Sequence, residues 1–68
     1  MPVITLELGK VDKATKVRLI KELVQKASEI TQIPEQAFVS LIKENEYDNI
    51  GNGTKTLTEV MAERQAQK

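Results

Sequence analysis

The sequence predicts an α+β fold, namely a β-α-β subunit with a short C-terminal hairpin that is assembled as an oligomer. Three observations support this: an alternating run at residues 2–8, an amphipathic pattern at 13–31, and a second β-branched run at 38–44 before an Asn-Gly turn signal. Two strands joined by a crossover helix lie parallel. One helix covers only one face of such a pair, so the bare face predicts subunit packing.

The composition excludes several classes of function. The 68 residues form a single domain, 1–68, near the lower size limit for a stable core. The chain has no Cys and no His, which excludes disulfides and the usual zinc ligands. Ten basic and ten acidic residues give zero net charge, without a basic block for nucleic acid and without an apolar run of the roughly 20 residues that span a membrane. We therefore expect a soluble, cytoplasmic protein without nucleic-acid or membrane partners.

Residues 2–8 alternate as a half-buried strand does. Ile4, Leu6 and Leu8 share one face, and the β-branched Val3 lies on the other. The glycine that follows allows the chain to leave the sheet. We expect a β-strand over this segment.

The next segment, residues 13–31, predicts a long amphipathic helix. Asp12 is a suitable N-cap for it. Apolar residues then recur at helical spacing and form one broad stripe. Among the polar positions, the spacing of Glu22 and Lys26 favours an i,i+4 ion pair.

Residues 38–44 allow two interpretations. As a strand, the segment is mostly apolar on both faces, as expected when both faces are covered. As a helix, Phe38, Leu41 and Ile42 have i, i+3, i+4 spacing, and Pro34 suits a first turn. The β-branched content and the glycine-rich sequence that follows favour the strand.

The C-terminal third contains a turn signal and a helix signal. Residues 49–54 include an Asn-Gly dipeptide, which supplies positive φ in tight hairpins. Thr56 and Glu59 have the spacing of a capping box, so we expect a short helix that frays into the polar tail at 65–68. Tyr47, before the hairpin, is interpreted as a packing residue with its hydroxyl in water.

The N-terminal proline is the residue with the most distinctive chemistry. Removal of an initiator methionine generally proceeds when the second residue is small, and here it leaves Pro2 with a free secondary amine. Such an amine acts as a general base when its surroundings lower its pKa toward the working pH. With Met1 retained, the Pro2 nitrogen is an amide without this capacity. We predict Pro2 as the catalytic residue, conditional on the removal of Met1.

With these features the chain resembles the 4-oxalocrotonate tautomerase family. The resemblance covers residues 2 to about 56 without a gap, in a chain of the right length. It rests on the proline start, the first strand, the connection into the long helix, the second strand and the glycine hairpin, which are found at Met1-Pro2, 3–8, 9–12, 38–44 and 50–53.

The resemblance implies a tautomerase-like subunit assembled as a homo-hexamer, with sites at subunit interfaces and no metal or organic cofactor. It implies an isomerase in which the Pro2 amine moves a proton within a small enol-keto acid or 2-hydroxydienoate substrate. The amine takes a proton from the enol oxygen or an acidic C–H, and its conjugate acid returns the proton to another carbon. A cation is also needed to hold the substrate carboxylate and stabilise developing charge.

Three positions that the resemblance assigns to substrate binding depart from the family pattern. Lys10 stands where the family has an arginine, Val39 where it has a second arginine, and Ile50 where it has an aromatic residue. Lysine is a point charge without the two-pronged contact that arginine makes with a carboxylate. We therefore expect a less cationic pocket that does not take the family's dicarboxylate. A monocarboxylate, a neutral enol or a nearly silent enzyme fits equally well.

Two other function classes fit parts of the sequence. A catalytically weak or dead oligomer that binds a small ligand would share the fold. The helical interpretation of residues 38–44 instead gives the outline of a dimeric ribbon-helix-helix DNA binder, whose paired strands enter the major groove. Against this second class, the polar face of the first strand carries no Arg or Lys for bases or phosphates.

Overall fold

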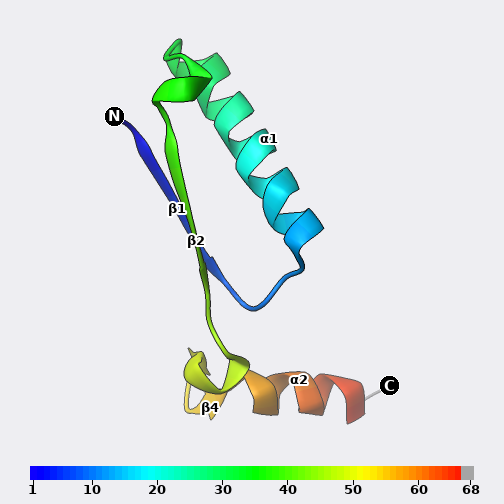
Figure 1. Cartoon of the computed structure of the whole chain (residues 1–68). Coiled ribbons are helices and arrows are strands. Elements are labelled where there is room, and N and C mark those ends of the chain that lie inside the picture. Colours follow the sequence, from blue (N-terminus) through cyan, green and yellow to red (C-terminus); the bar gives the residue numbers. More distant parts are fainter. Residues whose placement is uncertain (67–68) are drawn as a thin grey trace.

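The computed structural model describes residues 1–66 and has the predicted β-α-β order (Figure 1). Strand β1 (Val3–Leu8) is followed by helix α1 (Lys13–Thr31), a 3-10 turn η1 (Glu35–Ala37) and strand β2 (Val39–Glu44). The chain continues through a second 3-10 turn, two hairpin strands and a final helix: η2 (Tyr47–Asn49), β3 (Gly51–Asn52), β4 (Lys55–Thr56) and α2 (Leu57–Ala66).

Strands β1 and β2 pair in parallel, in a register that runs from Val3 opposite Val39 to Leu8 opposite Glu44. The ladder continues beyond the paired residues, because the Asn45 N–H donates to the Leu8 carbonyl at 2.8 Å. The strand interpretation of residues 38–44 is therefore confirmed for Val39–Glu44. The ribbon-helix-helix alternative required a helix over residues 38–44, and the strand at Val39–Glu44 rules it out.

Helix α1 begins and ends where the sequence predicts. The Asp12 carboxylate accepts a hydrogen bond from the Thr15 N–H at 2.8 Å, which caps the first turn. The predicted ion pair between Glu22 and Lys26 is wrong, because Glu22 contacts Arg18 instead. Both cations lie one helical turn from Glu22, so the spacing alone did not distinguish between them.

The hairpin and helix α2 form a C-terminal arm, residues 45–66. The hairpin is confirmed, but its turn is Gly53-Thr54 rather than Asn52-Gly53, because Asn52 belongs to β3 and pairs with Lys55. Gly53 has a φ of 64°, which fits the glycine at the first central position of a type II′ hairpin turn. The Thr56 N–H donates to the Glu59 carboxylate at 3.0 Å, and the Glu59 N–H donates to the Thr56 hydroxyl at 3.2 Å. The predicted fraying is wrong at residues 65–66, which are helical because Glu, Arg, Gln and Ala favour helix. The rest of that predicted tail, residues 67–68, lies outside the described residues.

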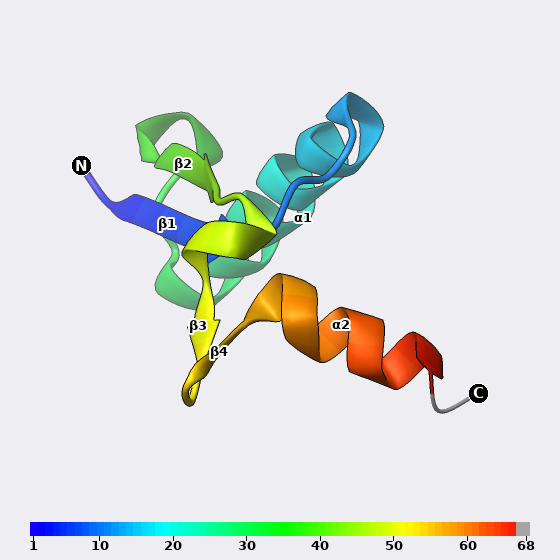
Figure 2. The ribbon, with the colours of Figure 1, turned by 90° about the horizontal axis from the view of Figure 1, so that it is seen from below.

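The described residues, taken as a single chain, form no fully buried core. None of the side chains described for this chain is fully buried, and the accessible surface is 5483 Å², where about 4,300 Å² is typical of a monomer of this mass. The radius of gyration is 15.9 Å, against about 11 Å for a compact chain of this length. Figures 1 and 2 show why: the C-terminal arm extends beyond the end of β2, and α2 runs separately from α1.

Apolar surface remains open on both sides of the β1–β2 pair. The alternate residues Ile4, Leu6 and Ile42 are half-buried on the face that α1 covers. On the opposite face, Val3 is 53% exposed and Leu41 is 52% exposed. Helix α1 exposes a further set of apolar side chains, at Val17, Ile20, Leu23 and Ile30.

Within the described chain, neither helix is long and apolar enough to cross a membrane.

Candidate active site

Pro2 lies at the amino end of the parallel strand pair, immediately before β1. Its carbonyl accepts a hydrogen bond from the Val39 N–H at 3.0 Å, and its own side chain is half-buried. Met1 is 87% exposed, so its removal would uncover the Pro2 nitrogen at an open edge of the fold. Val3 and Val39, which are partners in register, provide apolar surface beside it.

The other two predicted site residues lie at the opposite end of the sheet. Lys10 follows the end of β1, and Ile50 lies beyond the end of β2, where its carbonyl accepts a hydrogen bond from the Leu57 N–H at 2.8 Å. Strand β1 has six residues and is therefore about 20 Å long, so the two ends of the sheet lie about that far apart. A single chain therefore brings Pro2 and Val39 together and keeps Lys10 and Ile50 away from them.

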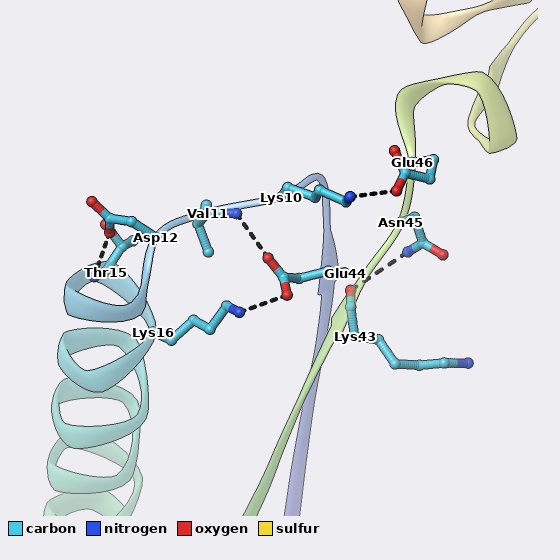
Figure 3. A network of polar contacts seen from close by, with 9 residues as sticks. All are labelled: Lys10, Val11, Asp12, Thr15, Lys16, Lys43, Glu44, Asn45 and Glu46. Carbon is cyan, nitrogen blue, oxygen red and sulfur yellow. Dashed lines mark hydrogen bonds and ion pairs between the residues drawn. The ribbon is translucent and has the colours of Figure 1, made fainter.

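Lys10 is engaged by a carboxylate of its own chain. Its ammonium contacts the Glu46 carboxylate, with the two side chains 66% and 59% exposed (Figure 3). The hydrogen bond and the charge of Glu46 raise the pKa of Lys10 above its ordinary value. Lys10 is therefore a cation at any physiological pH. An incoming anion would have to compete with Glu46 for it.

Glu44, the last residue of β2, ties the strand end to the start of α1. Its carboxylate accepts a hydrogen bond from the Val11 N–H at 3.0 Å and pairs with the Lys16 ammonium at 2.6 Å (Figure 3). The Lys16 contact, followed by the Val11 N–H, lowers the pKa of Glu44 below its ordinary value.

Within residues 1–66 no group of three or more acidic side chains converges as metal ligands would.

Tyr47 packs over Gly9, a contact that the sequence analysis did not foresee. A Cβ atom added to Gly9 would lie 2.3 Å from Tyr47 Cε1, so the close approach requires glycine at this position. The contact packs the segment after β2 onto the connection after β1. The only available signal was a glycine at a strand end and a lone tyrosine 38 positions later, and no local rule links them.

The Glu44 contacts predict a loss of stability in acid. Because the folded-state pKa of Glu44 is lowered, its stabilisation is complete above its ordinary pKa of 4.5 and is lost as the pH falls through the lower folded value. We expect Glu44→Gln to lower the Tm by a few degrees at pH 7, and the difference from the parent to shrink as the pH falls below 4.5 toward 3. Thermal unfolding from pH 3 to pH 7 measures this.

Glu35→Gln is the matched control, because Glu35 forms no ion pair within the described residues. The same loss of one carboxylate there should leave the pH dependence of the Tm unchanged. An equal Tm difference for Glu44→Gln at pH 3 and at pH 7 would contradict the assigned role of the carboxylate.

The fold described above is similar to that of a solved structure. The chain is similar to the crystal structure of DmpI from Archaeoglobus fulgidus, with a TM-score of 0.78 and 30% sequence identity. The match covers 84% of this chain and 98% of the DmpI chain. Comparisons with protein-family models and with curated proteins gave no match.

Proposed function

Since the chain belongs to the 4-oxalocrotonate tautomerase family, as its likeness to DmpI shows, we propose that it is an isomerase acting on a small enol-keto or 2-hydroxydienoate-type acid. The observation that supports this most directly is the position of Pro2. It lies immediately before β1 at an open edge of the fold and accepts a hydrogen bond from β2 through its carbonyl, so its nitrogen is available once Met1 is removed.

The chemistry follows from that amine. In its neutral form the Pro2 nitrogen takes a proton from the enol oxygen or an acidic C–H of the substrate. The resulting ammonium then returns the proton to another carbon of the conjugated system. General acid–base transfer of this kind contributes about 10²- to 10⁴-fold to a rate. Lys10 would hold the substrate carboxylate and stabilise the negative charge of the dienolate, while Val39 and Ile50 would form apolar walls.

We further propose that the active form is an oligomer, with the hexamer as its expected size. The absence of a buried core in the described chain and the apolar faces of the sheet and of α1 support association. The separation of about 20 Å between Pro2 and Lys10 supports a composite site, because a small acid is far shorter than this distance. Pro2 and Val39 of one subunit would then face Lys10 and Ile50 of another.

The proposal is tested by comparing protein with and without Met1. Intact mass identifies the two forms, and the assay follows ketonisation of phenylenolpyruvate and of small 2-hydroxydienoates. We expect turnover only by the form that lacks Met1. Equal turnover by the Met1-retaining form would contradict a Pro2 base, and an inert oligomer lacking Met1 would favour a small-ligand-binding role.

A further inference from the structure

A cavity of about 340 Å³ lies beside Lys10, where the C-terminal arm meets the ends of β1 and β2. Its lining residues are all polar and include a single cation, Lys10, and two carboxylates; they are Lys10, Asn45, Glu46, Tyr47, Asp48 and Thr58. Asp48 accepts a hydrogen bond from the Thr58 hydroxyl at 2.5 Å, whereas Glu46 contacts Lys10. Lys10, the one cation that lines this cavity, is therefore already paired with Glu46, a carboxylate that lines the same cavity.

We propose that Glu46 determines substrate specificity by competing with the substrate carboxylate for Lys10. This inference rests on the proposed function, in which Lys10 faces the substrate. Both side chains are more than half exposed, so their ion pair is weak and an incoming carboxylate displaces Glu46 at little cost. The displaced Glu46 remains nearby as a negative charge and repels a second carboxylate. The site therefore prefers an enol with one carboxylate to an enol with two.

The backbone holds Glu46 at this place while its side chain stays free to move. The hydrogen bond from the Asn45 N–H to the Leu8 carbonyl and the packing of Tyr47 over Gly9 fix the segment on both sides of Glu46. Displacement by a substrate therefore rotates the side chain without moving the segment.

The neighbouring carboxylate of Glu44 does not take over this role. It is occupied by the Val11 N–H and by Lys16, one contact to each oxygen. Of the effects that shift the pKa of Lys10, the charge of Glu44 is the smallest. Glu46 is thus the carboxylate whose removal changes the charge available to a ligand of Lys10.

The test uses protein lacking Met1 and two matched substrates, 2-hydroxypentadienoate with one carboxylate and 2-hydroxyhexadienedioate with two. We expect Glu46→Gln to raise the ratio of kcat/KM for the dicarboxylate over that for the monocarboxylate by about threefold, the effect of one charge at ~7 Å in water-like screening. The change should fall mainly on KM. Glu46→Asp keeps the charge and should stay close to the parental ratio.

Glu63→Gln is the matched control, since Glu63 pairs with Lys55 within the arm and does not line the cavity. It should leave the selectivity ratio unchanged. Tautomerisation with the same ratio in the parent and in Glu46→Gln would overturn the role of Glu46 and leave the proposed function intact.

A binding experiment separates this inference from the proposed function. Fumarate and crotonate, a dianion and a monoanion of similar shape, are titrated into the parent and into Glu46→Gln while the amide NMR signals of residues 10 and 46 are followed. Glu46→Gln should strengthen fumarate binding more than crotonate binding, even if no form turns over an enol, in which case only the proposed function fails. Unchanged affinities for both anions would overturn the inference.

Discussion

Pro2→Ala is expected to lower kcat/KM for enol ketonisation by about a hundredfold, toward the lower end of what general acid–base catalysis contributes. Alanine is small, so Met1 removal should still proceed and leave a free amine, but a primary one. The proline ring removes rotation about the N–Cα bond, so the lone pair of its nitrogen has a set direction. The alanine amine rotates freely and loses this orientation.

The control for this variant is Pro34→Ala, because Pro34 is the only other proline of the chain and lies before η1. It should retain parental turnover. Intact mass must show that both variants lack Met1, and sedimentation must show that both keep the parental assembly. Parental activity in Pro2→Ala would rule out a mechanism that depends on a secondary amine.

Leu41→Asp is expected to dissociate the proposed oligomer and to unfold the released subunits. Leu41 is 52% exposed in the protomer and lies opposite Thr5 on the sheet face that α1 does not cover. In the proposed assembly that face is buried, and an unpaired buried charge costs about 3–5 kcal/mol. Because the described protomer has no buried core, the separated chain lacks the apolar burial that would keep it folded.

Sedimentation velocity and circular dichroism over a range of concentrations measure this effect. Leu41→Met conserves volume and apolar character, so it should keep both the parental mass and the parental spectrum. A parent protein that is monomeric and fully folded would contradict the proposal of obligatory association. A Leu41→Asp variant of unchanged mass would place the interface elsewhere.

Most of the fold was predictable because its signals are local. Asp12 caps a helix through the N–H of Thr15, only three positions away, and Thr56 and Glu59 close a capping box at the same spacing. Gly53 adopts the positive φ of the hairpin turn, although the turn is Gly53-Thr54 and Asn52 lies in β3. The choice of strand at Val39–Glu44 was less secure, since its apolar spacing also fits a helix and only pairing with β1 decides between them.

The contacts around the candidate site were not predictable in the same way. Val11 and Glu44 lie 33 positions apart, yet the N–H of one donates to the carboxylate of the other. Glu46 contacts Lys10, and Tyr47 covers Gly9, because β2 runs parallel to β1 and delivers the following segment to the same end of the sheet.

The sequence by itself thus determined strand β1, helix α1 and the capping box that begins α2, and it singled out Pro2 as the residue with the most distinctive chemistry. Only the tertiary structure decided that residues 39–44 pair with β1 as a strand and that Glu46 shares the charge of Lys10. The physical reason is range: caps and turns depend on side chains within a few positions, whereas these arrangements depend on how a parallel pairing brings distant segments together.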